Sequence, residues 1–126
     1  MNGGNFVKVF KCNKCGNIVA MIEGNEQLLK CCGESLNDIL VRNGDGEVKH
    51  KPVMQVEDNQ VYIKVGEEQH PMDEEHYIKW ILVVGTSYSK LLKFNPGELP
   101  ECVVPYENGL QAFAYCNKHS LWKNEL

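Results

Sequence analysis

Residues 60 to 65 read Gln60-Val61-Tyr62-Ile63-Lys64-Val65, so polar and apolar side chains alternate along the segment. Side chains of a β-strand point to opposite faces in turn, and this alternation predicts a strand with one face in a core and one in solvent. Five further short runs are rich in β-branched and aromatic residues. Together with the first, the runs are Pro52 to Val56, Gln60 to Val65, Tyr77 to Val84, Tyr88 to Phe94, Glu101 to Tyr106 and Leu110 to Tyr115.

Turn-forming residues separate these runs. They are Asp58-Asn59, Gly85-Thr86-Ser87, Asn95-Pro96-Gly97 and Asn108-Gly109. No helical periodicity of any length accompanies them. Short strands at this spacing are typical of an antiparallel β-sandwich of roughly seven strands, so the sequence predicts a mainly β fold.

The N-terminal part of the chain is organised differently. Residues 6–36 contain the closely spaced cysteines, and their apolar stretches are too short for a core of their own. A unit below about 40 residues usually needs a metal or disulfides to fold. The segment from Asn43 to Glu47 is rich in turn formers and predicts a linker or exposed loop. We expect a small stapled domain over residues 1–37 and a sandwich domain over residues 38–126.

Composition argues against several classes of partner. The net charge is -4 and the pI is about 5.5, so a broad basic surface for nucleic-acid phosphates or anionic lipid is missing. The longest apolar run, Ile81 to Val84, is far shorter than a membrane span, and no signal peptide is evident. We therefore expect a soluble, cytoplasmic protein that binds neither nucleic acid nor membrane. In such a reducing compartment, cysteines serve metals or catalysis rather than disulfides.

The four N-terminal cysteines have the spacing of metal ligands. Cys12-Asn13-Lys14-Cys15-Gly16 forms a CxxC knuckle, and Cys31-Cys32 follows after 15 intervening residues. Four sulfur ligands favour tetrahedral zinc or iron. Neighbouring side chains of an extended backbone point to opposite faces, so the adjacent pair can reach one ion only with a distorted angle. Spacing alone leaves open a zinc staple, an iron centre that relays one electron, and a redox dithiol.

The histidines of the chain all lie in the predicted sandwich. They are His50, His70, His76 and His119. A single histidine is more often a hydrogen-bonded polar residue than a ligand. Here the context favours ligands, since Cys116-Asn117-Lys118-His119 is a CxxH, in which sulfur and imidazole can share one ion. Iron, copper and zinc all accept such a set. Cys102 lies outside it, and we expect it to face the sandwich interior as a small hydrophobe.

These motifs follow one another in a distinctive order along nearly the whole chain. They are Cys12-x2-Cys15-x15-Cys31-Cys32, His50, His70-Pro71-Met72, Glu75-His76-Tyr77-Ile78-Lys79-Trp80 and Tyr115-Cys116-Asn117-Lys118-His119-x2-Trp122-Lys123. The combination resembles the desulfoferrodoxin family, the two-iron class of superoxide reductase. Its order and spacing are far more specific than a lone CxxC.

The resemblance implies two iron centres per chain. In the first, a distorted tetrahedral Fe(Cys)4 centre of the desulforedoxin type, the ligands would be Cys12, Cys15, Cys31 and Cys32. In the second, an Fe(His)4(Cys) centre in an immunoglobulin-like sandwich, they would be His50, His70, His76 and His119, with Cys116 as axial ligand. The resemblance also implies a homodimer that reduces superoxide by one electron to hydrogen peroxide, with electrons from rubredoxin or a similar donor.

The implied ligand set agrees with the chemistry of the residues. Four neutral imidazoles and one thiolate leave ferrous iron an open position for a small anion. The thiolate would donate electron density to the iron, much as an axial thiolate tunes haem. We expect the segment of Asn117 and His119 to supply backbone N–H bonds to the Cys116 sulfur.

The loop before His50 departs from the family pattern. In the family, a lysine directly before the first site histidine attracts superoxide and orders a water that protonates the peroxide; Lys49 holds this position. Many members read Glu-Lys-His, and their glutamate occupies the sixth position of oxidised iron. Here Val48 stands at that place and Glu47 lies one residue further back. In an extended loop Glu47 would point away from the metal, so we expect a loop that does not close on the ferric site in the usual way.

Two other functions stay open on the sequence alone. One is a rubredoxin-like electron-transfer or structural metalloprotein, which would lack an open coordination position. The other is a zinc or copper site for hydrolysis or binding, together with a zinc-filled cysteine cluster. Metal content and colour of the purified protein separate both from a two-iron oxidoreductase that acts on superoxide.

Overall fold

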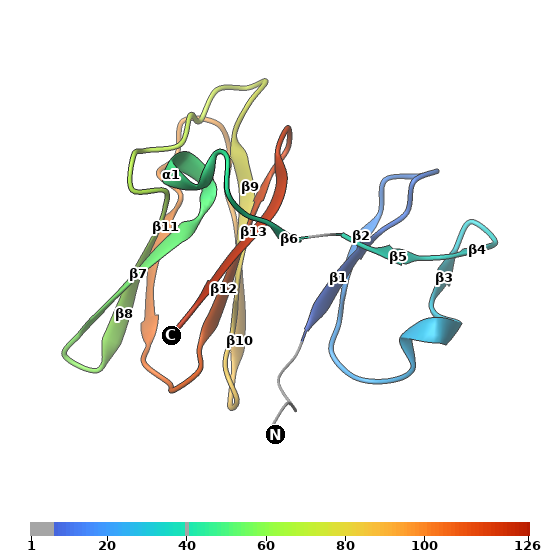
Figure 1. Ribbon diagram of the computed structural model, residues 1–126, viewed down its shortest axis with the longest axis horizontal. Helices are drawn as coiled ribbons and strands as arrows, with labels where there is room; N and C mark the ends of the chain where they lie inside the picture. The colour runs from blue at the N-terminus through green and yellow to red at the C-terminus, as the bar shows by residue number, and fades with distance from the viewer. Residues whose placement is uncertain (1–6, 40) are drawn as a thin grey trace. The chain divides into compact units, whose positions relative to one another are not determined.

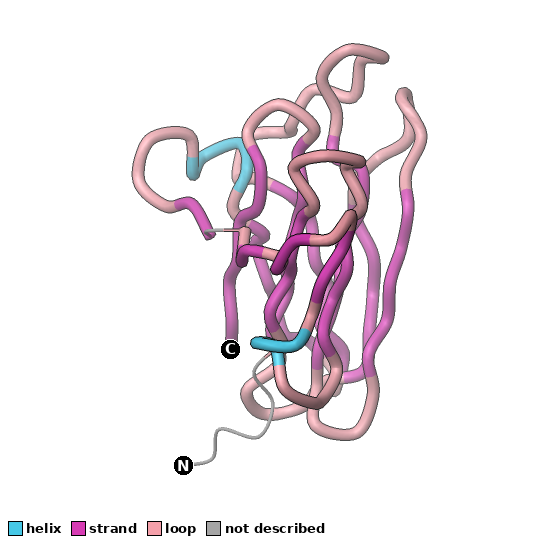
Figure 2. The backbone as a smooth tube through the Cα atoms, turned by 90° about the vertical axis from the view of Figure 1, so that its right-hand side faces the viewer, coloured by secondary structure: helices cyan, strands magenta, loops and turns pink. Residues whose placement is uncertain are grey.

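The computed structural model describes residues 7–39 and 41–126, without the side chains of residues 37 and 38. Contacts within the chain divide it into two compact units, Met1–Leu40 and Val41–Leu126. The fold is mainly β, as the alternation of the sequence predicts (Figure 1). Helical backbone in the described residues is limited to two single turns, η1 (Glu26–Leu28) and α1 (Glu47–His50), drawn in cyan in Figure 2. No helix in these residues is long and apolar enough to cross a bilayer.

The first unit is built from very short strands. A three-stranded antiparallel sheet has the order β2 (Ile18–Met21), β1 (Lys8–Lys11) and β5 (Asn37–Asp38), and β3 (Lys30–Cys31) pairs with β4 (Glu34–Ser35). Its buried hydrophobic residues among those described are only Val9, Phe10 and Cys12. Such a small core cannot offset the conformational entropy of the unit, so another source of stability is required.

The second unit is a sandwich of two sheets. The larger sheet contains β10 (Ser89–Lys93), β9 (Ile78–Val84), β12 (Gln111–Cys116), β13 (Ser120–Glu125) and β6 (Val41–Arg42), in that order. The smaller sheet contains β11 (Glu101–Pro105), β8 (Gln60–Val65) and β7 (Pro52–Glu57). All pairings are antiparallel except the short parallel pair of β13 and β6.

The core of the sandwich lies between the two sheets. Strand β8 has the burial pattern that its alternation predicts: Val61, Ile63 and Val65 are buried and the residues between them are exposed. These three side chains belong to one apolar cluster with residues of the facing sheet, among them Ile81 and Ala114. Burial of a side chain of this size contributes on the order of 1.5–3 kcal/mol. The second unit therefore has a core that does not depend on a metal.

Backbone bonds hold α1 at one end of this sandwich. The N–H of Gly66 donates to Lys51 O at 3.0 Å, and the N–H of Glu68 donates to Val48 O at 3.0 Å. Gly66 has a φ of +85°, and a Cβ there would lie 2.7 Å from the carbonyl oxygen of Lys49. Only glycine combines this backbone conformation with so close an approach. The turn after β8 thereby fixes the short helix that carries Lys49 and His50.

Candidate metal centres

The four N-terminal cysteines converge into one cluster. Their sulfur atoms all lie within 4.8 Å of one another. Cys15 Sγ is 3.5 Å from Cys31 Sγ, which is 4.0 Å from Cys32 Sγ, and all four cysteines are free thiols. This is the donor set and the spacing that a tetrahedral thiolate-bound ion requires. The structure therefore brings together every residue that the sequence places in the first site.

Two turns of the backbone make this convergence possible. In the CxxC knuckle the N–H of Gly16 donates to Cys12 O at 2.9 Å, and the N–H of Cys12 donates to Asn17 O at 2.8 Å. Cys31 ends β3, but Cys32 adopts a left-handed conformation with a φ of +54°. The chain thus leaves the extended form between the two adjacent cysteines, and this twist allows neighbouring sulfurs to face the same point.

Ionisation of the cysteine cluster is uneven. Backbone N–H groups, of Cys15 first and of Lys14 second, lower the pKa of the Cys12 thiol to about 6. The nearby sulfurs of Cys15, Cys12 and Cys31 raise the pKa of the Cys32 thiol to about 12. Close sulfurs cannot all become thiolates without a cation among them, so metal binding to this cluster must release protons.

The second cluster is a ring of four imidazoles beside one thiol. Successive ring centroids lie 4.5 Å apart from His50 to His70, 4.7 Å from His70 to His76, 4.9 Å from His76 to His119 and 4.9 Å from His119 back to His50. Neighbouring rings are nearly perpendicular, at 72° to 83°. Ligand atoms of His50, His70, His76 and Cys116 lie within 4.8 Å of one another, and His119 Nδ1 is 3.9 Å from Cys116 Sγ.

Loops and strand ends of the sandwich supply these side chains. His50 ends α1, and His70 and His76 lie in the segment between β8 and β9, where Asp73 and His76 form an isolated bridge. Cys116 ends β12 at a shift of register against β9. Such β-bulges often redirect a side chain next to a functional site. The buried strands thus support a cluster that loops alone could not hold in place.

Hydrogen bonds to backbone carbonyls select the nitrogen that His50 and His70 offer. His50 Nδ1 lies 2.8 Å from Gly46 O and His70 Nδ1 lies 2.6 Å from Pro71 O, so each Nδ1 carries the proton and each Nε2 presents a lone pair. His70 Nε2 and His76 Nε2 are buried without a hydrogen-bond partner. Buried polar atoms are normally paired, and two orphaned imidazole nitrogens in one cluster fit a bound cation.

Burial lowers the pKa of His50, His70 and His76, which favours the neutral imidazole that a metal ligand must be. Desolvation lowers the pKa of His70 to about 4, against the opposing hydrogen bond to Pro71. Desolvation, followed by the charge of His119, also lowers the pKa of His76, and the positive charges of Lys118 and Lys49 add to this effect. Lys49 directly precedes His50 in α1, and its side chain is exposed.

Asn117 joins the two loops of the cluster in an unforeseen way. Its backbone N–H donates to Tyr77 O at 3.2 Å, so the expectation that this segment directs the Asn117 N–H at the Cys116 sulfur was wrong. Its side chain accepts from the Tyr77 N–H at 2.9 Å and donates to Glu75 O at 2.9 Å. Asn117 thus holds the residues on both sides of His76 against the turn that carries Cys116 and His119.

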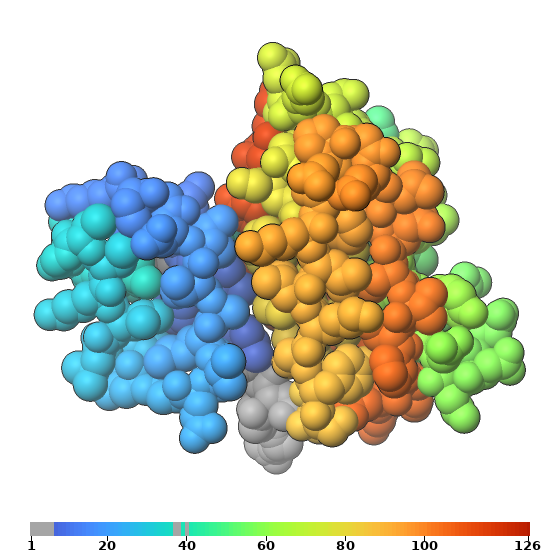
Figure 3. All heavy atoms as spheres, turned by 180° about the vertical axis from the view of Figure 1, so that it is seen from behind, coloured from blue at the N-terminus to red at the C-terminus, as the bar shows by residue number. Residues whose placement is uncertain are grey.

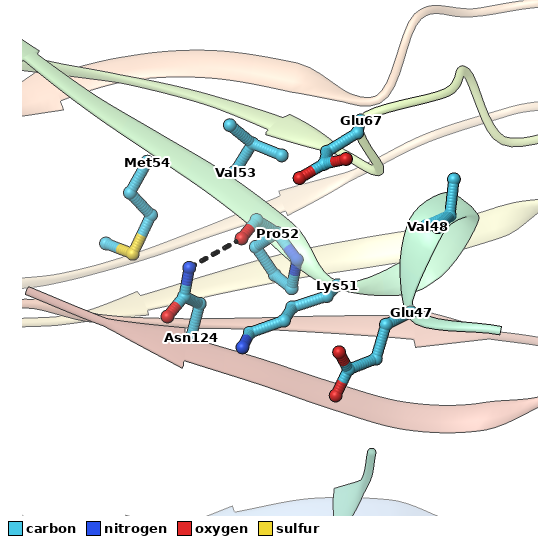
Figure 4. A pocket seen from close by; sticks show the side chains of 8 residues that line it. All are labelled: Glu47, Val48, Lys51, Pro52, Val53, Met54, Glu67 and Asn124. Atoms are coloured by element: carbon cyan, nitrogen blue, oxygen red, sulfur yellow. Dashed lines mark hydrogen bonds between the residues drawn. The ribbon is translucent and has the colours of Figure 1, made fainter. Parts of the chain in front are cut away.

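The loop before His50 is helical rather than extended. Alternation of side chains along an extended loop therefore does not apply to the direction of Glu47. Glu47, Val48 and Lys49 belong to α1, and the Glu47 carboxylate accepts from the Gly44 N–H at 2.8 Å. Figure 4 shows Glu47 and Val48 leaving this turn in different directions, with Glu47 on the side of Lys51 in a groove beside β7. The carboxylate therefore has a partner outside the histidine ring.

The acidic segment between β8 and β9 forms the projecting end of the second unit. It is the yellow-green tip in Figure 3 and carries both His70 and His76. The acidic residues of this segment are exposed, whereas its His70 is buried. An anion that approaches from this side meets negative charge first, which gives a nearby lysine electrostatic value.

Cys102 lies away from both clusters. It is partly buried on β11 and packs against the sandwich core, in agreement with the expected role of a small hydrophobe. Burial raises the pKa of its thiol, so the thiolate is disfavoured.

Two residues to which the sequence analysis assigned no role contact the histidine ring: Trp122, which it names only as part of the family motif, and Arg42, which it does not name. Trp122 Nε1 donates to His119 O at 3.0 Å, and the indole stacks on the His50 ring at 4.8 Å. Arg42 Nη1 donates to the same carbonyl at 3.2 Å. The sequence offered one signal for Arg42, which is that it is the only arginine of the chain.

Comparison with known proteins agrees with this two-part architecture. The family model "Desulfoferrodoxin" matches residues 43–125, and "Desulfoferrodoxin, N-terminal domain" matches residues 4–39. A desulfoferrodoxin homolog of Archaeoglobus fulgidus is 42% identical over 94% of this chain and 96% of its own. Desulfoferrodoxin of Nitratidesulfovibrio vulgaris is 39% identical over 96% of this chain and 98% of its own.

A solved structure supports the same conclusion at the level of the fold. The superoxide reductase of Treponema pallidum superimposes with a TM-score of 0.76 at 26% identity, over 96% of this chain and 98% of that one. With two family models in chain order, relatives that match at nearly full length, and both ligand clusters assembled, the chain belongs to the desulfoferrodoxin family.

Proposed function

We propose that this protein is a superoxide reductase that holds iron in both clusters. The observation that carries the proposal is the closed ring of four buried or half-buried imidazoles next to a buried thiol, with two nitrogens left unpartnered. Proteins of Treponema pallidum and Pyrococcus horikoshii that are similar to this chain are named superoxide reductase. Reduction of superoxide to hydrogen peroxide takes one electron and two protons, and iron held by the histidines and Cys116 would supply the electron.

The residues of this site have separable tasks. We assign the ligand role to His50, His70, His76, His119 and Cys116. Their neutral imidazoles add no charge, so the thiolate of Cys116 is the only anionic group of the set and the one that can donate electron density. Fixed Nδ1–H bonds of His50 and His70 to backbone carbonyls keep their Nε2 lone pairs pointed at the cluster.

We assign anion attraction and proton delivery to Lys49. Its side chain is exposed on α1, and its charge acts on His76. A cation at this point counteracts the field of the acidic tip and raises the local concentration of superoxide. Its ammonium group can also donate a proton, directly or through water, to the reduced substrate.

Glu47 is assigned no ligand role in the resting protein. Its carboxylate is bonded to the Gly44 N–H, and Val48 occupies the place of the glutamate of many relatives. This arrangement leaves the ring without a side-chain anion from α1. We expect the oxidised site to stay open to small external anions.

The first unit is assigned as the Fe(Cys)4 domain, and the sandwich unit as the reductase domain. The cysteine cluster can change oxidation state without changing ligands, so it serves as an electron relay or as the staple of its unit. We further propose a homodimer in the cytoplasm that receives electrons from a rubredoxin-like donor. An exposed cysteine cluster suits transfer from a soluble partner, since Cys15 and Cys32 reach the surface.

The experiment combines metal analysis with kinetics. We expect about two irons per chain, one per cluster, a ferric tetrathiolate spectrum, and a second thiolate band after oxidation. Pulse radiolysis should show a rapid reaction with superoxide that Lys49→Ala slows. A colourless zinc protein would exclude the proposal. Iron without any reaction with superoxide would favour a rubredoxin-like electron-transfer or structural protein instead.

A further inference from the structure

The only arginine of the chain is exposed and contacts the backbone of one ring histidine, His119, and the indole of Trp122, which stacks on another, His50. All other basic residues, histidines aside, are lysines, yet Arg42 stands on β6, the two-residue strand that follows the cysteine unit in the sequence. Arginine differs from lysine in its planar fork of N–H donors and in its capacity to stack on an aromatic ring. Arg42 uses one N–H donor on the His119 carbonyl and its stacking plane on the Trp122 indole.

The first contact is with the backbone of a ligand. The His119 carbonyl accepts from Trp122 Nε1 at 3.0 Å and from Arg42 Nη1 at 3.2 Å. A carbonyl oxygen has two lone pairs, so these two donors satisfy it completely. The peptide that follows His119 is thereby fixed, and Ser120, the next residue, has a left-handed φ of +66°.

The second contact is with the indole. The Arg42 guanidinium carbon lies 5.1 Å from the centroid of the Trp122 ring, and the same ring stacks on His50 at 4.8 Å and 19°. Trp122 is 1% exposed, and Gly46 leaves it room, since a Cβ there would come within 3.3 Å of the ring. Arg42, Trp122 and two of the four ring histidines therefore form one contiguous group.

We propose that Arg42 is a positioning residue of the histidine and cysteine centre: it orients His119 through the carbonyl and His50 through the indole. Residue 42 pairs with Trp122 in the parallel register of β6 and β13, which places the backbone of Arg42 beside that of Trp122. The inference needs a metal in this cluster, as the proposed function does, but it does not depend on the reaction.

The test uses the full iron-loaded chain with Arg42→Ala and Arg42→Lys. Retention of the second iron against a chelator should fall roughly tenfold in Arg42→Ala, the low end of the loss for residues that orient a metal ligand. The thiolate band of the oxidised site should shift, because the ring geometry changes. Lysine should restore little, since an ammonium group has neither the fork nor the stacking plane. The cysteine-bound iron is the internal control, and Lys64→Ala controls for loss of a surface charge.

Two results would overturn the inference. One is wild-type retention and an unchanged band in Arg42→Ala; the other is full recovery of both in Arg42→Lys, which would mean that charge alone acts. A double-mutant cycle with Trp122→Phe adds a third check, because residues that share one carbonyl should show coupled effects and independent ones additive effects. None of these readouts uses superoxide, so failure of the reductase assignment and failure of this inference are distinguishable.

Discussion

The two metal clusters of this protein are assembled in opposite ways. The cysteine ligands lie within one short stretch, from Cys12 to Cys32, and two of them are exposed. The ligands of the histidine ring come from positions as far apart as His50 and His119, and strands with a large buried core carry them. The first unit is thus expected to need its metal in order to fold, whereas the second unit is expected to fold without one. A site whose ligands lie close together in the sequence can form locally and is easily lost. A site whose ligands lie far apart in the sequence requires the folded domain first.

The largest expected effect comes from removal of both metals. The first unit should lose its structure, since a bound structural metal can contribute about 10–16 kcal/mol to folding, while the sandwich should still unfold cooperatively. Hydrogen exchange followed by mass spectrometry would show full exposure of residues 7–39 and retained protection in β8 and β12. Protection of the first unit in metal-free protein would contradict the proposed difference in metal dependence between the two units. Readdition of iron is the control for irreversible damage.

The next effect concerns Asn117, which should matter to only one cluster. Asn117→Ala removes the side-chain bonds to the Tyr77 N–H and Glu75 O, so His76 becomes free to move. Iron retention in the histidine site should fall by roughly 10–100-fold, with the cysteine site unaffected. Asn117→Asp keeps the acceptor and loses the donor, so an intermediate loss is expected. A chelator titration that finds both sites weakened equally would argue for general destabilisation instead.

A smaller effect should appear in anion binding at the oxidised histidine site. Because Val48 cannot act as a ligand, the ferric form should bind azide more readily than glutamate-bearing relatives do. Val48→Glu should lower the azide affinity by about tenfold, or ~1.4 kcal/mol. Val48→Gln has nearly the same shape without the charge and is the matched control. Equal azide affinities in a spectral titration of the three proteins would show that the loop does not govern access.

The smallest effect is a pH dependence confined to the sandwich. Bonds from the Ser87 hydroxyl, and from the N–H groups of Ser87 and Thr86, lower the pKa of the Glu107 carboxyl below its usual 4.5. A lowered folded-state pKa contributes stability above the unfolded value that is lost as the pH falls through the folded value. In Glu107→Gln the melting temperature of the sandwich should therefore fall less steeply as the pH is lowered below about 4.5. Identical acid slopes for both proteins would remove Glu107 from this role.

The sequence predicts the strands well because one rule governs them. Alternation over Gln60 to Val65 follows directly from a sheet with one buried face, and the predicted run from Tyr77 to Val84 agrees with β9 to within one residue. Both ligand clusters were identifiable too, but for different reasons. The cysteine spacing is a local signal, whereas the histidines became specific only through their order along the chain.

What the sequence could not predict depends on contacts between distant residues. The helical turn of α1 is held by bonds from Gly66 and Glu68, and the four residues from Glu47 to His50 show no helical pattern on their own. Asn117 was assigned to the wrong partner because its bonds to Glu75 and Tyr77 cross about 40 residues of sequence. Arg42 carries no motif at all. Side chains that orient a ligand do so through their positions in space, and the spacing of residues along the sequence does not reveal these positions.

The docking of α1 against the turn after β8 offers a local reporter of the reductase site. The amide hydrogens of Gly66 and Glu68 are both committed to carbonyls in or next to α1. Their exchange with deuterium requires the helical turn to separate from the sandwich, so two amides report how often this loop opens. A ligand or donor protein that loosens the loop would speed up exchange at these two positions, even where the average structure stays the same.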